Sequence, residues 1–476
     1  MDGRFLFHDY LLSKYPVGIA RVSALTCSFL LACYLSIAIH LDSANSPIHH
    51  PIMASTTRRH DLDNLRTFLT CLVIVHHTSN CYGGPGSGPY KSELIATAYP
   101  ASRLPLFVFN AFNHSFFMGV FFWISGRVSC QSLQRIDMDP QRTRWSFMRS
   151  KLLRLGIPAI CSAVILEPIT QIVGQSSWDT TSVGEFLKEY YATLDSFQGP
   201  IWYVVNLMLF DIVASLCCST ALRDKTKSSV KGNERDYSGN VELSTGYMLI
   251  RKHGWLAATI ASFIIRLYYP VGVVMKPNGL QVAFAPQYIY TYALGFASAG
   301  AESTLTGPFT GTSVDGVAAS ILISLSLVPL PQVPQLFTTT QNNIQSAESN
   351  GMKGGLNASA FLYAFWNELS FALVGPALAS LFYKVHNTPA KSRLFQSCNS
   401  YGAYLIHMLV SGVVERIIEW LLVSNDVPLA ALVTTGAWRV CGLVFMTGLV
   451  GALNVVASFA VSRFLLDRLP ALRRLV

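Results

Sequence analysis

Residues 58–78, RRHDLDNLRTFLTCLVIVHHT, join a charged beginning to an apolar run that ends in two adjacent histidines. Arg66 lies near the start of this run and His77 follows eleven residues later, which is three turns of an α-helix. The two side chains would project from nearly the same helix face, roughly 16 Å apart along the axis. One helix could therefore hold an anionic group near a membrane surface and present an imidazole deep in the bilayer.

His77 is the candidate catalytic residue of this segment. An ionisable side chain inside a membrane span is costly, and it usually faces the bundle interior or a watered cavity. Near pH 7 a neutral imidazole could act as a general base or as a nucleophile. The structural alternative is a histidine bonded to a neighbouring helix. His76 lies about 100° around the helix and cannot face the same site squarely.

The composition predicts an all-α, polytopic integral membrane protein. Of the 476 residues, 51% are hydrophobic and only 13% are charged, and the mean hydropathy is +0.38, whereas soluble domains carry about 25% charged residues. Apolar stretches long enough to cross a bilayer, about 20 residues each, predict a bundle of about ten transmembrane helices. Their approximate ranges are 64–82, 105–126, 152–174, 200–222, 254–275, 281–301, 314–333, 358–383, 400–423 and 437–462.

The basic residues predict the orientation of these helices. Alternate loops and loop ends hold 24 of the 35 Lys and Arg residues, and the loops on the other side hold five. Because cytoplasmic loops collect Lys and Arg, we expect both termini of the ten-helix core to be cytoplasmic. The net charge of +9 then reflects contact with anionic lipid headgroups, and no nucleic-acid partner is expected. The basic segments are 58–66, 127–154, 223–252, 384–393 and 463–474.

The chain divides into an N-terminal extension, residues 1–57, and a membrane domain, residues 58–470. The extension contains one apolar segment, residues 22–41, which is long enough for an extra helix but fits the charge rule poorly. Whether residues 1–52 span the membrane is left open. Within the membrane domain we expect a basic cytoplasmic loop at about 223–252 and a polar lumenal loop at about 334–356.

The ten cysteines do not indicate a metal site or a disulfide framework. Most lie within predicted spans, and none forms a CxxC or Cys/His spacing. They are most simply small apolar packing residues. We therefore expect no metal cofactor.

Six segments resemble one known family as an ordered set. They are DNLRTFLTCLVIVHH (63–77), FFMGVFFWISGR (116–127), KLLRLGIP (151–158), GPIWYVVNLMLF (199–210), QYIYTYALGFASA (287–299) and SYGAYLIHMLV (400–410). Together they resemble the acyltransferase 3 family of integral membrane O-acyltransferases, which includes bacterial glucan-modifying succinyltransferases and fungal relatives. The likeness covers nearly all of residues 58–465. Two positions depart from the family pattern: Lys151 stands where Arg is more usual, and Arg127 stands where an apolar or aromatic residue is usual.

The resemblance implies a reaction, its donor and a catalytic residue. The family moves an acyl group, acetyl or similar, from acyl-CoA to a hydroxyl of a saccharide or small metabolite, and its essential histidine matches His77. Arg66, Lys151 and Arg154, with Arg127 beside them, would bind the phosphates of acyl-CoA. Lys151 and Arg154 are a turn apart and would share a helix face, Arg binding as a fork and Lys as a point charge. Snorkelling to lipid headgroups is the alternative.

A further set of residues could line the site: Asp63, Ser125, Gly126, Trp202, Glu368, Tyr401 and His407. Ser125 and Gly126 favour close helix packing over nucleophilic chemistry. Glu368 could orient a histidine or an acceptor hydroxyl, or it could pair with Arg266 or Arg439. His407 could be a second site-lining group or a structural hydrogen-bonding residue.

The alternative function is a multi-pass transporter of a polar or anionic solute, in which Arg66, His77 and Glu368 would bind substrate or relay protons. No internal repeat supports that design. The sequence places the protein in the endoplasmic reticulum, another endomembrane or the plasma membrane. It leaves open the acceptor, the acyl chain and the oligomeric state.

Overall fold

The computed structural model describes residues 58–469, except 87, 99, 138, 140, 175–179, 194–198, 218–244, 276–277, 300–313, 329–350, 425–432 and 434–437. The predicted N-terminal extension, residues 1–57 with its apolar segment 22–41, lies outside the described residues. So does most of the two predicted polar loops, 223–252 and 334–356.

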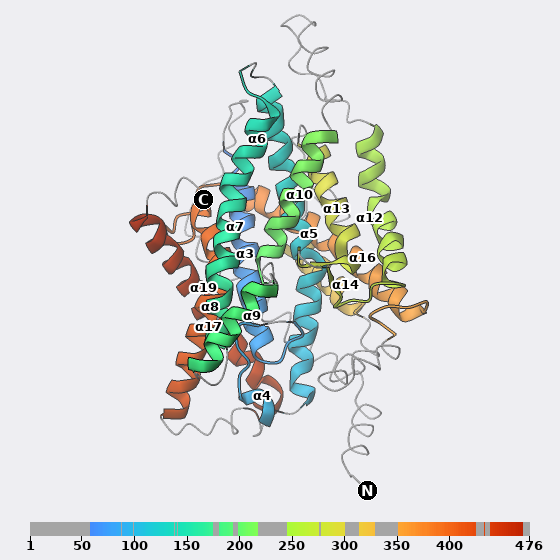
Figure 1. Cartoon of the computed structure of the whole chain (residues 1–476). Coiled ribbons are helices and arrows are strands. Elements are labelled where there is room, and N and C mark those ends of the chain that lie inside the picture. The colour runs from blue at the N-terminus through green and yellow to red at the C-terminus, as the bar shows by residue number, and fades with distance from the viewer. Residues whose placement is uncertain are drawn as a thin grey trace, which may run out of the picture.

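The described residues form a predominantly helical bundle, which agrees with the predicted all-α class (Figure 1). The strand structure among the described residues is an antiparallel pair of two-residue strands, β1 (Val274–Met275) and β2 (Leu280–Gln281). The helices are α3 (His60–Cys81), α4 (Leu94–Thr97), η1 (Pro100–Arg103), α5 (Leu104–Asp137), α6 (Arg144–Lys151), η2 (Leu152–Gly156), α7 (Ile157–Cys161), η3 (Ser162–Leu166), α8 (Glu167–Gly174), α9 (Thr180–Thr193), α10 (Ile201–Cys217), α12 (Thr245–Arg266), η4 (Val282–Phe284), α13 (Ala285–Ala297), α14 (Val314–Ser326), α16 (Ala358–Val385), α17 (Ser397–Ser424) and α19 (Trp438–Arg468).

Each of the ten predicted apolar stretches contains a helix, but only part of them meet the requirements of a membrane span. Among the described residues, four helical segments are long and apolar enough to cross a bilayer: Leu104–Asp137, Arg144–Gly174, Ala358–Val385 and Cys441–Arg468. Other described helices, such as α13 and α14 with 13 residues each, are shorter than the roughly 20 residues that a span needs. The structure thus supports an integral membrane protein without establishing ten spans.

Hydrogen bonds between helices and loops define two ends of the bundle. At the first, the α3 N-terminal end, Asn64 of α3 bonds to the segment between α16 and α17, and Arg58 and the last part of α19 bond to the first residues of α17. At the second, the α4 end, the loop after α3 bonds to the distal half of α17. In Figure 1 the first end is uppermost and α4 is at the bottom.

Helix α3 lies inside the bundle and contacts α5, α16, α17 and α19. Asp61 and Asp63 occupy its first turn, where carboxylates interact favourably with the positive end of the helix dipole. Most of its later residues are buried. Because α3 is one unbroken helix from His60 to Cys81, Arg66 and His77 keep the three-turn relation that their spacing predicts.

Helix α5 crosses α13 at two glycines. A Cβ atom on Gly126 would lie 2.2 Å from the Tyr292 carbonyl oxygen, and one on Gly295 would lie 2.0 Å from the Trp123 carbonyl oxygen. The backbones therefore approach closely at both positions, which is the packing role predicted for Gly126.

Helix α5 also continues to Asp137, so residues 127–137 are helix where the sequence suggested a loop. Cys130, Leu133 and Ile136 are buried at a spacing of three residues, which gives this extension an apolar stripe of its own.

Candidate functional site: an imidazole pair inside the bundle

His77 of α3 and His407 of α17 lie side by side in the bundle. Their ring centroids are 5.1 Å apart. His407 is fully buried and His77 is half-buried. The structure therefore brings the predicted catalytic histidine together with one of the predicted site-lining residues, although 330 positions of sequence separate them.

The hydrogen bonds of His407 fix which of its nitrogens can act as a base. Its Nδ1 lies 2.6 Å from the carbonyl oxygen of Tyr404. Because a carbonyl only accepts hydrogen bonds, Nδ1 of the neutral ring carries the proton and Nε2 has the free lone pair. This Nε2 is buried and has no hydrogen-bond partner in the described structure. An imidazole in that state can accept a proton or a hydrogen bond.

Tyr404 of α17 connects His407 to Tyr203 of α10. The Tyr404 ring lies 5.9 Å from His407 and 5.9 Å from Tyr203, and the Tyr404 hydroxyl donates to the Pro200 carbonyl at 2.7 Å. The hydroxyls of Tyr203 and Ser125 are 2.7 Å apart. Ser125 is thus hydrogen-bonded to a tyrosine on α10.

Trp202 and Tyr401 belong to the same region of the bundle. The half-buried Trp202 packs 5.4 Å from Tyr288 and 6.4 Å from Phe122. The Tyr401 hydroxyl donates to the Leu155 carbonyl at 3.3 Å, which ties the start of α17 to η2. Four of the predicted lining residues, Ser125, Trp202, Tyr401 and His407, therefore lie around one group of aromatic side chains.

His76 faces a different neighbour from His77. It is buried, and its ring packs 5.3 Å from Phe117 of α5 and 5.5 Å edge-to-face from His77. This separation agrees with the 100° rotation expected between adjacent helical residues. The two histidines cannot present their rings to one reacting atom in the same way.

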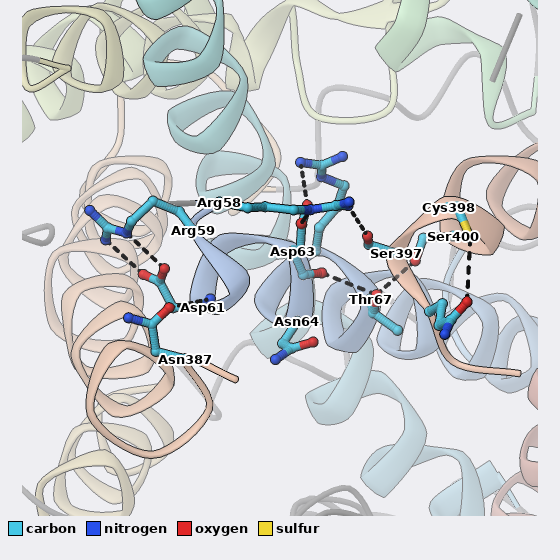
Figure 2. Close-up of polar contacts among 12 residues, drawn as sticks. Arg58, Arg59, Asp61, Asp63, Asn64, Thr67, Asn387, Ser397, Cys398 and Ser400 are labelled. Carbon is cyan, nitrogen blue, oxygen red and sulfur yellow. Dashed lines mark hydrogen bonds and ion pairs between the residues drawn. The ribbon is translucent and has the colours of Figure 1, made fainter. Parts of the chain in front are cut away.

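Arg66 lies within a group of charged residues at the α3 N-terminal end. Its guanidinium is 3.5 Å from Asp63, and Asp63 also accepts from Arg58 Nε at 2.6 Å. Arg58 reaches Ser397 of α17, and Arg59 pairs with Asp61 at 2.7 Å, as Figure 2 shows. The Arg66 side chain is 37% exposed, so an anionic ligand could reach it without burying a charge. Asp63 itself serves as the carboxylate partner of two arginines.

Lys151 has a buried carboxylate partner, Asp211. Its Nζ lies 2.9 Å from Asp211 on α10 and 2.9 Å from the Ser129 hydroxyl. Asp211 is 2% exposed and also accepts from the Tyr292 hydroxyl at 2.7 Å. Lys151 therefore joins three helices through Asp211. Nothing in its spacing could have indicated that partner.

Arg154 and Arg127 differ in burial. Arg154 is exposed and lies in the π-helical turn η2. A π turn holds more residues than an α turn. The angle between Lys151 and Arg154 around the helix axis therefore differs from the one that a regular α-helix predicts. Arg127 is 2% exposed inside α5 and donates to the Ser298 carbonyl at 3.0 Å. It thus bonds to the end of α13, where a cation interacts favourably with the helix dipole.

Glu368 lies away from the imidazole pair, between α12, α13 and α16. It is fully buried, and its Oε1 accepts from Ser262 at 3.3 Å and from Asn367 at 3.2 Å. Its Oε2 has no hydrogen-bond partner, and neither has any guanidinium nitrogen of Arg266. The direct pairing of Glu368 with Arg266 that the sequence left open is therefore not formed in the described structure.

The comparisons with known proteins agree with this arrangement. A family model for an acyltransferase domain, acyltransferase 3, matches residues 59–455. The chain belongs to this family. It thus lies within a family of enzymes that transfer acyl groups, as the ordered segments predicted.

One curated relative is similar to part of the chain. Glucans biosynthesis protein C of Escherichia coli (strain SMS-3-5 / SECEC) is 27% identical over 285 residues, 56% of this chain and 66% of that protein. The chain therefore covers just under two thirds of the relative's length. No solved structure matches the chain.

Proposed function

We propose that the protein is a multi-pass membrane enzyme that transfers an acyl group, acetyl or similar, from acyl-CoA to a hydroxyl of a saccharide or small metabolite. The observation that carries the proposal is the imidazole pair inside the bundle, His77 with His407 at 5.1 Å, within a chain that belongs to an acyltransferase family. The name of the glucan-related relative supports a carbohydrate acceptor.

In this proposal His77 is the general base. Its imidazole takes the proton of the acceptor hydroxyl, and the oxygen forms a bond to the thioester carbonyl carbon. The carbon–sulfur bond then breaks, and the proton passes to the departing CoA thiolate. His407, whose Nε2 has a free lone pair, lies beside His77 and holds the His77 ring in place by packing against it. A covalent acyl-imidazole on His77 is the alternative route, and trapping of an acylated protein without acceptor would reveal it.

The donor enters at the α3 N-terminal end. Arg66 and Arg154 are accessible there and bind the CoA phosphates, which Arg recognises through paired N–H groups. Lys151 contributes positive charge while it remains paired with Asp211. The pantetheine arm then runs along α3 toward His77, roughly 16 Å deeper by the helical rise. This end faces the cytosol, where acyl-CoA is available.

Thiol release by purified protein tests the reaction. Protein in detergent or nanodiscs is given acetyl-CoA with and without glucose oligosaccharides, and free CoA and acylated product are measured. Acceptor-dependent CoA release that His77→Ala abolishes supports the enzyme. Absence of any product, together with uptake of an anionic solute into proteoliposomes, would instead identify a carrier.

The orientation has its own test. On a background without native cysteines, Ser150→Cys of α6 and Lys91→Cys of the α4 end, both exposed positions, are labelled with an impermeant maleimide in sealed vesicles. We expect Ser150→Cys to react only from the cytosolic side and Lys91→Cys only from the opposite side. The reverse pattern would put the arginines in a compartment without donor and would exclude acyl-CoA entry at that end.

A further inference from the structure

The most unusual polar group in the described bundle is Arg266, the last residue of α12. It is fully buried, and its three guanidinium nitrogens have no hydrogen-bond partner. The guanidinium lies between two aromatic rings, 4.7 Å from the centroid of Tyr363 and 5.2 Å from that of Phe284. Cation–π contacts of this kind recover part of the lost hydration, but they leave five N–H donors unused.

Unpaired hydrogen-bond acceptors occur in the same region. Ser262, one turn before Arg266 on α12, bonds to Glu368, and Asn367 bonds to the same carboxylate oxygen. Gln287 of α13 donates to the Asn367 carbonyl at 3.4 Å. Glu368 Oε2, Asn367 Oδ1 and Gln287 Oε1 are each buried without a partner. We call Arg266, Gln287, Asn367 and Glu368 the Arg266 cluster.

The chemistry of these unpaired atoms selects the kind of ligand. Leaving such groups buried and unsatisfied costs free energy at every one of them, so their presence indicates an occupant. A simple anion would satisfy the Arg266 donors and leave three acceptors unpaired, whereas a cation would do the reverse. A hydroxyl group both donates and accepts. A ligand with several hydroxyls, a saccharide or other polyol, satisfies both sets together.

The Arg266 cluster is connected to the imidazole pair by a row of rings. Phe284 lies 4.3 Å from His114 of α5, and His114 lies 5.9 Å from Phe117. Phe117 in turn packs against His76, the neighbour of His77. The cluster also lies in the half of the bundle toward the α4 end, because Gln287 bonds to the Ser115 carbonyl early in α5. The cluster is thus displaced from Arg66 toward the α4 end of the bundle.

We propose that the Arg266 cluster binds hydroxyl groups of the acceptor, a saccharide or other polyol, and directs one hydroxyl toward His77. The inference rests on the proposed acyl transfer and adds an acceptor site to it. The donor and the acceptor would then reach the imidazole pair from opposite ends of the bundle. Glu368 and Arg266 carry opposite charges, which makes the cluster electrically balanced and suited to a neutral ligand.

Acceptor and donor kinetics test this site with four variants: Arg266→Gln, Glu368→Gln, their double variant and, as matched control, Arg439→Gln at an exposed position of α19. The double variant removes both charges together, which avoids leaving one buried charge uncompensated. We expect the first three to raise the half-saturating concentration of glucose oligosaccharides by roughly 10- to 100-fold, the effect of losing charge-assisted hydrogen bonds. The half-saturating acetyl-CoA concentration should stay unchanged, and the control should resemble the wild type.

Ligand-induced thermal stabilisation gives a readout that does not need turnover. Glucose oligosaccharides should raise the melting temperature of the wild type and of Arg439→Gln, and fail to raise that of a folded Arg266→Gln or double variant. Stabilisation by phosphate or succinate alone would assign the cluster to an anion. Stabilisation by none of these probes would mean that it holds water only, and either result would overturn the inference.

The two proposals fail in different ways. If the wild type acylates oligosaccharides and the cluster variants keep its acceptor affinity, the acceptor site is elsewhere and the acyl transfer stands. If oligosaccharides bind through the cluster but no acyl group is transferred, the binding site stands and the enzymatic proposal is wrong.

Discussion

The two groups of arginines in this bundle are in opposite situations. At the α3 N-terminal end, Arg58, Arg59 and Arg66 each have a carboxylate within a few residues of sequence and retain contact with solvent. Arg266, in the other half, is fully buried and without a hydrogen-bond partner. An exposed ion pair contributes little free energy, so its arginine can exchange the carboxylate for a phosphate group of a ligand. A buried arginine without a hydrogen-bond partner costs much free energy. A bound ligand therefore explains the presence of Arg266 better than a purely structural role does.

The imidazole pair is the proposed reaction centre, and removing its base should have the largest effect. His77→Ala is expected to lower the rate of acyl transfer by ~10²- to 10⁴-fold, the usual contribution of a general base. His76→Ala, whose ring packs on Phe117, should retain much of the activity. CoA release at saturating substrates measures both. An inactive His76→Ala beside an active His77→Ala would overturn the assignment.

The buried pair of Lys151 and Asp211 provides the next test, because it combines features of both groups. Lys151→Ala would leave Asp211 buried without its cation and is expected to cost about 3–5 kcal/mol of unfolding free energy. The double variant Lys151→Ala/Asp211→Asn should recover much of that loss. Denaturant titration of the protein in detergent measures it. If the single variant is as stable as the wild type, the ion pair contributes little and Lys151 is available for phosphate.

The exposed arginines should affect donor binding rather than the rate at saturation. Arg66→Ala and Arg154→Ala are each expected to raise the half-saturating acetyl-CoA concentration by about tenfold or less, because a phosphate contact at an accessible site is present in ground and transition states alike. Arg142→Ala, which removes an exposed pair with Asp139, is the control. Unchanged donor affinity in both variants would mean that these residues anchor the helices at the membrane surface.

The smallest effect is expected for Arg58. Its side chain is 65% exposed although it bonds to Asp63 and Ser397. Arg58→Ala should change the free energy of unfolding by about 0–1 kcal/mol, as for other surface pairs. Thermal unfolding in detergent measures it. A loss as large as that of Lys151→Ala would show that the comparison between exposed and buried pairs does not hold here.

Relations between residues of one helix could be predicted from the sequence, whereas contacts between two helices could not. The relation of Arg66 to His77 follows from the unbroken α3 and was predictable from spacing. The His77–His407 and Lys151–Asp211 contacts join residues far apart in the chain. A single sequence does not show which helices pack together, and the chain shows no repeat that would suggest it.

Helix ends were the other difficulty. The predicted span 254–275 is displaced toward the N-terminus, since α12 covers Thr245–Arg266. Tyr269 precedes Pro270, and the residue before a proline disfavours helical geometry, so the apolar residues after Arg266 form turns and the short strand β1 instead. The polar start of α12, which reads as a loop, is helix. This displacement places Arg266 at a helix terminus and not in the middle of a span.

The close crossing of α5 and α13 will influence how substitution data on this protein are interpreted. The structure leaves no space for even a methyl group at Gly126 and Gly295. In a saturation mutagenesis screen, both positions should therefore tolerate substitution as poorly as the position of His77. The loss at the glycines would be a loss of assembled protein, whereas the loss at His77 would be a loss of turnover by normally folded protein. Only a screen that measures abundance alongside activity would separate a steric constraint from a chemical one.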